Sequence, residues 1–137
     1  MIRSNVFADL EEIRCSLCGK NLSKVPSMGI VVGLRNIEKG TFTDVRVCCK
    51  NTCFQSIMAT MNENEIITTQ DLLDLMNPEI YMKTLMKSMN GFYKGKCVES
   101  ERVFEDYKYL MLSIYPYVSR NLSEAELIQV EQIKIFP

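Results

Sequence analysis

Four cysteines in the first half of the chain have the spacing of a metal site. Cys15 and Cys18 form a C-x2-C pair, and Cys49 precedes Cys53 by about one helical turn. The C-x2-C spacing lets two sulfurs approach one tetrahedral ion, and Gly19 relieves the backbone where that turn is tightest. The sequence therefore predicts that Cys15, Cys18, Cys49 and Cys53 bind one zinc ion. The plainer alternative for the first two is that they are small buried hydrophobic residues.

The third ligand has two candidates, because Cys48 and Cys49 are adjacent. Cys49 is favoured because its distance along the chain to Cys53 matches a helical turn, and strand alternation would turn Cys48 to the opposite face. Cys97 lies between Lys96 and Val98 in a predicted loop. We interpret it as a spare thiol without a metal role.

The chain contains no histidine. A closed zinc site must then consist of four thiolates, and such sites are structural because no water ligand remains to be activated. The same absence excludes Ser-His and Cys-His nucleophile pairs and an imidazole base. Neither a P-loop nor a G-x-G-x-x-G motif is present. Cys48, beside Arg46 and Lys50, is the single thiol worth testing as a nucleophile, and we expect a protein without enzymatic activity.

The sequence also indicates a compartment. Charges interrupt the apolar residues at the N-terminus, unlike a secretory signal, and the apolar stretch at residues 109–115 is far shorter than the roughly 20 residues of a membrane span. We expect an intracellular, cytoplasmic protein with no membrane partner. Thiols in that reducing environment are metal ligands more often than disulfides.

The elements that must position the cysteines can be predicted from residue patterns. A short helix is expected before Cys15, at residues 6–13. Residues 28–36 and 41–48 are rich in β-branched side chains and are joined by a turn, which predicts a β-hairpin. Apolar residues at i, i+3, i+4 and i+7 from Phe54 to Met61 predict a helix that begins at or just before Cys53. A polar break at residues 63–65 suggests two units, residues 1–62 and 63–137.

The second unit has helical patterns. Thr68 with Asp71 predicts a helix that runs through Met76, and Asn77-Pro78 predicts the start of another that stops at Asn90-Gly91. Two further helices are expected, one from Ser100 that Pro116 ends or kinks, and one capped by Ser123 and Glu126. The predicted fold class is α+β, with a small zinc-stabilised unit followed by a helical region packed on it.

The treble-clef arrangement consists of a zinc knuckle, which is the turn that carries the C-x2-C pair, then a hairpin, and then a helix. The N-terminus of that helix supplies the last two ligands. The stretch from Cys15 to Met61 resembles the short treble-clef fingers of the TRASH and MYM type, whose pattern runs C-x2-C, a hairpin, then C-x3-C leading into a helix. The four predicted zinc ligands match that pattern. The resemblance covers residues 15–61 alone, and it implies a treble-clef fold around a structural zinc ion.

Charge points to one class of partner. Residues 1–62 carry eight Lys and Arg against five Asp and Glu, whereas residues 63–137 carry eight against twelve. Arg35, Lys39 and Arg46 on the predicted hairpin could bind phosphates. However, Phe42 is the one aromatic residue nearby that could stack on a base, and the acidic second half would repel a polyanion. A nucleic-acid-binding zinc finger is therefore the alternative function.

The favoured function is a non-catalytic zinc-stabilised binding module that acts as an adaptor or regulator through protein contacts. A run of methionine and aromatic residues supports it, because methionine adapts to irregular partners. The same run could instead be core, or it could be buried against a second copy of the chain in a homo-oligomer. Its members are Met76, Tyr81, Met82, Met86, Met89, Phe92 and Tyr93.

Overall fold

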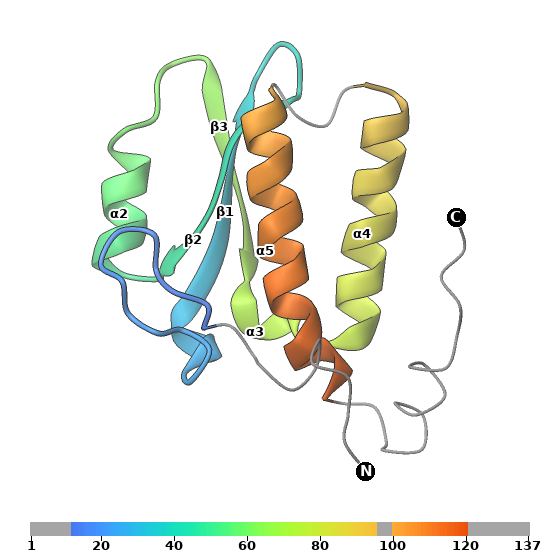
Figure 1. The fold of residues 1–137 in the computed structure, drawn as a ribbon. Helices are drawn as coiled ribbons and strands as arrows, with labels where there is room; N and C mark the ends of the chain where they lie inside the picture. Colours follow the sequence, from blue (N-terminus) through green and yellow to red (C-terminus); the bar gives the residue numbers. More distant parts are fainter. Residues whose placement is uncertain (1–11, 96–99, 121–137) are drawn as a thin grey trace.

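A three-stranded antiparallel sheet lies at the centre of the fold (Figure 1). The structure, a computed structural model, describes residues 12–95 and 100–120. The strands are β1 (Gly29–Asn36), β2 (Phe42–Cys49) and β3 (Glu65–Asp71), in the order β2-β1-β3. The predicted hairpin is confirmed as β1 and β2, and the one-turn 3-10 helix η1 (Pro26–Met28) leads into it. The mixed α+β class is confirmed with it.

The third strand replaces a predicted helix. The prediction that Thr68 and Asp71 cap a helix through Met76 is wrong, because residues 65–71 form β3 and each of them has a partner on β1. Only Leu72–Leu75 are helical, as α3, with Asp71 at the N-cap. β3 pairs with the edge of β1 that β2 leaves open. Ile66, Ile67, Thr68 and Thr69 are all β-branched, so the segment also carries a local strand signal, which the cap pattern of Thr68 and Asp71 obscured.

The remaining helices follow the predicted starts. Helix α2 (Thr52–Met58) follows β2, α4 (Pro78–Tyr93) follows α3, and α5 (Glu101–Ser119) comes last. The side chain of Asn77 accepts hydrogen bonds from the backbone N–H groups of Glu79 and Ile80, at the start of α4. The side chain of Ser100 caps α5 in the same way. Both caps satisfy N–H groups that have no partner within the helix.

The ends of these helices differ from the prediction. Helix α4 continues through Asn90-Gly91 and ends before Gly95, whose φ of 68° is the left-handed conformation that commonly terminates helices. Pro116 lies inside α5 and does not end it. Proline removes the hydrogen bond to the carbonyl of Leu112. Leu112 is 65% exposed, so water can reach that side of the helix and the disruption is tolerated.

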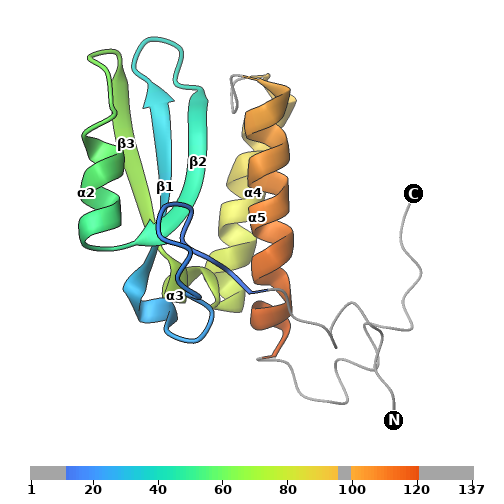
Figure 2. The ribbon, with the colours of Figure 1, turned by 60° about the vertical axis from the view of Figure 1, so that its left-hand side comes forward.

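The helices cover both faces of the sheet. Helix α2 lies on one side, and α4 and α5 lie side by side on the other (Figures 1 and 2). Strand alternation explains this arrangement, because Val32 and Leu34 on β1 point to the opposite face from Val31 and Gly33. Apolar residues on both faces make β1 the buried central strand.

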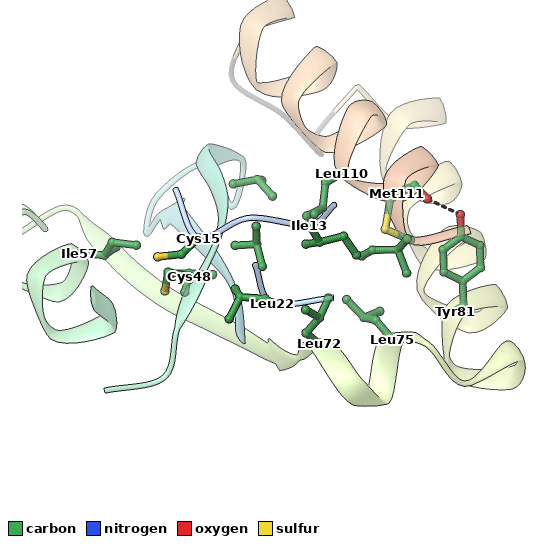
Figure 3. Packing of buried hydrophobic residues seen from close by; sticks show 14 of the residues in the cluster. Ile13, Cys15, Leu22, Cys48, Ile57, Leu72, Leu75, Tyr81, Leu110 and Met111 are labelled. Carbon is green, nitrogen blue, oxygen red and sulfur yellow. Dashed lines mark hydrogen bonds between the residues drawn. The ribbon is translucent and has the colours of Figure 1, made fainter. Parts of the chain in front are cut away.

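The two faces share one continuous hydrophobic core (Figure 3). Ile57 of α2 lies near Cys15 and Cys48 at one end, Leu22 and Leu72 lie in the middle, and the core continues to α5. β1 also pairs with strands from either side of the predicted boundary at residues 62 and 63. The division into two units remains a prediction, and the sheet and the core both cross it.

Several predictions concern residues outside the described ranges. These are the helix at residues 6–13 apart from Glu12 and Ile13, the last helix after Ser123, and the loop that holds Cys97. Ile13 itself is buried and lies outside any helix. Among the described helices, each falls short of the length or the apolar character that crossing a membrane requires.

Tyr81 links α4 to α5 through a hydrogen bond that should make stability depend on alkaline pH. Its hydroxyl donates to the carbonyl of Met111 at 2.7 Å (Figure 3), and burial, with the nearby Tyr107 and Tyr115, raises the pKa of Tyr81 from 10.0 to about 12. A raised folded-state pKa favours the protonated form. The contribution of Tyr81 to the stability of the folded state is therefore complete below pH 10 and is lost as the pH rises through about 12.

We expect Tyr81→Phe to lower the free energy of unfolding by about 1 kcal/mol at neutral pH and to flatten the loss of stability above pH 10. Urea unfolding between pH 7 and 11.5 measures both effects. Tyr93→Phe is the matched control, because Tyr93 is 93% exposed. Identical pH profiles for the two variants would contradict the assignment.

Candidate metal centre

The structure brings together the four cysteines that the sequence singles out. Cys15 and Cys18 lie in the loop before η1, Cys49 is the last residue of β2, and Cys53 lies in the first turn of α2. Their sulfur atoms all lie within 4.8 Å of one another. The Sγ atoms of Cys18 and Cys49 are 3.6 Å apart, far longer than a disulfide bond, and all four cysteines are free thiols.

The loop that carries Cys15 and Cys18 is shaped by its own backbone. The N–H of Gly19 donates to the carbonyl of Cys15 at 3.0 Å, and Gly19 has a φ of 78°, which closes a turn that few other residues could adopt. The backbone N–H groups of Leu17 and Cys18 each donate to the Sγ of Cys15 at 3.4 Å. These two donors stabilise negative charge on that sulfur.

Three contacts attach this loop and the residue after β2 to neighbouring segments, and the sequence patterns do not reveal them. The N–H of Ser16 donates to the carbonyl of Val47 on β2 at 2.9 Å. The N–H of Lys50 donates to the carbonyl of Met28 at 3.0 Å, and its side chain forms an ion pair with Asp71 of β3 at 3.1 Å. The cysteines at either end of the hairpin are therefore fixed relative to one another by the sheet.

The clustered thiols strongly affect one another's pKa values. Burial would raise the pKa of Cys15, but the N–H groups of Cys18 and Leu17 outweigh it and lower that pKa to about 6. Burial and a hydrogen bond with Cys18 raise the pKa of Cys49 to about 12, and a hydrogen bond with Cys15 raises the pKa of Cys53. One thiolate thus suppresses ionisation of its neighbours. A bound cation would reverse this effect, because metal coordination stabilises every thiolate.

Cys48 has a different environment from Cys49. It is fully buried at 0% exposure, and burial, followed by the charge of Cys15, raises its pKa to about 11. Strand alternation separates it from the cluster as expected, so Cys49 is the residue that the structure places beside the other three sulfurs. A reactive cysteine needs exposure and a lowered pKa. Both properties of Cys48 argue against a nucleophilic role.

The geometry of the cluster fits a tetrahedral ion. Four sulfurs at the usual Zn–S distance of about 2.3 Å lie about 3.8 Å apart at the corners of a tetrahedron. The observed limit of 4.8 Å and the closest separation of 3.6 Å are near that value. Sets of four thiolates suit zinc and iron–sulfur centres. With all four positions occupied by protein, such a centre holds chain segments together and has no position for a substrate.

The three basic residues predicted to bind nucleic acid do not form one surface. Arg35 and Arg46 lie on opposite faces of the sheet, because Arg46 pairs with Val32, three residues before Arg35. Arg46 forms an ion pair with Asp44 at 2.7 Å, which neutralises part of its charge. Arg35 donates to the carbonyl of Gly40, and Lys39 lies in the turn of the hairpin.

Comparisons with protein-family models, with curated proteins and with solved structures found no match to this chain.

Proposed function

We propose that this protein is a non-catalytic binding module in which a zinc ion, held by Cys15, Cys18, Cys49 and Cys53, stabilises a treble-clef unit that presents a helical surface to another protein. The site supports the zinc through its four clustered thiols. The sequence of knuckle, β-hairpin and helix around those thiols supports the treble clef. The free thiols are consistent with a reducing, intracellular location.

The observation that carries the proposal is an exposed apolar stripe on α4. We define the α4 stripe as Met82, Met86, Met89 and Tyr93, whose exposed fractions are 53%, 62%, 65% and 93%. Their spacing of i, i+4, i+7 and i+11 places them on one side of the helix. Large apolar side chains gathered on one surface are typical of interaction sites, and methionine adapts to partners of irregular shape.

The rest of the predicted methionine and aromatic run packs against other parts of the protein. Tyr81 is buried, Met76 packs against the core, and Phe92 makes edge-to-face contacts with the rings of Phe104 and Tyr107. Helix α4 therefore uses one side to pack and leaves the stripe to solvent. The core interpretation is correct for Tyr81 and Met76, whereas Phe92 packs against the rings of α5. The interaction interpretation now rests on the stripe alone.

A charged residue introduced into the α4 stripe tests the proposal. We expect Met89→Glu to weaken self-association or partner capture by about tenfold or more, because burying an unpaired carboxylate in an apolar contact is costly. Leu112→Glu on α5 is the matched control, since Leu112 and Met89 are both 65% exposed. Sedimentation equilibrium measures self-association, and capture by tagged protein from an extract of the native host measures binding to other proteins.

The proposal fails if the wild-type protein is monomeric at all concentrations and the Met89→Glu and Leu112→Glu variants capture the same proteins in equal amounts. Retention of the wild type on a nucleic-acid column, weakening steeply with salt, would instead favour the phosphate-binding alternative.

A further inference from the structure

A cavity of about 460 Å³ separates the sheet from the α4–α5 pair. Val31 and Gly33 of β1 line it on one side, Thr84 and Ser88 of α4 on another, and Leu110 and Met111 of α5 form part of its apolar lining. Part of its lining is exposed, so the space opens to solvent on one side. It lies within the range of small-molecule sites, which are mostly apolar with a few polar groups.

Glycine at position 33 shapes one wall of this cavity. A Cβ at Gly33 would lie 2.3 Å from Cε1 of Phe42, so a larger residue would displace the ring. With glycine there, the Phe42 ring lies across β1, and the guanidinium of Arg35 sits 5.3 Å from its centroid. Arg35 also donates from Nε and Nη2 to the carbonyl of Gly40, at 3.2 and 3.0 Å. The wall therefore carries a cation held in a fixed position.

The charge of the lining has one sign. Arg35, Lys39 and Lys87 are its ionised residues, and among the described residues that line the cavity there is neither aspartate nor glutamate. Lys39 and Lys87 are exposed, whereas Leu110 and Met111 are buried. The positive charge thus lies at the open end of the cavity, and the apolar surface lies at the closed end.

We propose that this cavity binds a small amphiphilic carboxylate, with its apolar body against Leu110 and Met111 and its carboxylate between Arg35 and Lys87. An apolar interior with cations at the mouth matches that ligand in both polarity and charge. The side chain of Ser88 and the hydroxyl of Tyr107, 2.5 Å apart, add polar groups to the lining.

This site is separate from the α4 stripe. Thr84, Ser88 and Gly91 line the cavity at i, i+4 and i+7, whereas Met82, Met86 and Met89 are offset from them by roughly half a turn at about 100° per residue. The two sets lie on opposite sides of the same helix. The inference therefore does not rest on the proposed protein contact, and either one can fail alone.

Calorimetric titration of the full chain with decanoate tests the inference, with decanol as the uncharged probe. We expect one decanoate to bind per chain, about fivefold or more tighter than decanol, because only the carboxylate gains from the cations. Absence of binding at millimolar decanoate, or equal affinity for decanol, would overturn the proposal.

Variants locate the bound probe. Lys87→Gln should weaken decanoate binding by about fivefold. Lys83→Gln, on the same helix but outside the cavity and paired with Glu79 at 3.1 Å, should leave it unchanged. Thr84→Phe should abolish binding by filling the cavity, with circular dichroism used to verify its fold. Equal effects of the two lysine variants, or full binding by a folded Thr84→Phe protein, would overturn the assignment.

Discussion

Removal of the proposed zinc ion is expected to unfold the region around the four cysteines and to lower the melting temperature by about 10 °C or more. Zinc binding to four thiolates contributes to folding directly, with apparent free energies of about 10 kcal/mol in isolated fingers. The loss should spread beyond the loop, because Cys15 lies in the same core as Ile57 and Leu22. Calorimetry before and after treatment with a strong chelator measures the effect, and added zinc should restore the original transition.

Two adjacent cysteines provide a matched pair for this prediction. Cys49→Ala should abolish stoichiometric zinc, as measured by native mass spectrometry, because Cys49 is one of the four clustered sulfurs. Cys48→Ala should retain one zinc per chain and lose only core packing, because Cys48 is buried outside the cluster. If chelator-treated wild-type protein has the same melting transition as untreated protein, the zinc assignment is refuted. If only Cys48→Ala loses zinc, the third ligand is Cys48 and the assignment to Cys49 is wrong.

Truncation of Leu72 is expected to produce the second large effect. Leu72 is fully buried at 0% exposure, and its side chain lies against Gly29 beside that of Leu22. We expect Leu72→Ala to lower the free energy of unfolding by roughly 2 to 5 kcal/mol through lost burial and the cavity left behind. Leu73→Ala is the control, because Leu73 is 50% exposed and should lose less than about 1 kcal/mol. Urea unfolding at neutral pH measures both.

The same variant tests the division of the chain at residue 62. Leu72 lies after that boundary, whereas Leu22 and Gly29 lie before it. If the sheet makes the two ranges cooperative, Leu72→Ala should shift a single unfolding transition seen equally by tyrosine fluorescence and by zinc release. Two separate transitions, with only the later one shifted, would support independent units.

Each half of the cysteine cluster was predictable because the information within it is local. Ligand spacing in a C-x2-C pair and across one helical turn follows directly from backbone geometry, so the spacing of Cys15 and Cys18, and that of Cys49 and Cys53, identified each pair. Strand alternation likewise separates Cys48 from Cys49 without any knowledge of the rest of the fold. The starts of α4 and α5 were equally accessible, because caps such as Asn77 and Ser100 act within one turn.

The features that escaped prediction depend on contacts between distant segments. Residues 65–71 contain both a helix-cap pattern and four consecutive β-branched residues at 66–69, and pairing with the free edge of β1 decides in favour of the strand. The methionines of α4 have helical spacing whether they pack or face solvent, so exposure could be decided only with α5 in place. The cavity lies between the sheet and two helices, so the residue pattern of any one segment does not predict it.

The position of the hairpin between its cysteines has a consequence for folding kinetics. Cys18 and Cys49 are 31 positions apart, and the intervening chain contains β1, the turn and nearly all of β2. An ion that joins these two sulfurs early closes a loop around the hairpin, and the entropy lost in closing such a loop grows only slowly with its length. The strands then meet within a confined segment. Zinc present during refolding should therefore accelerate sheet formation as well as stabilise its product.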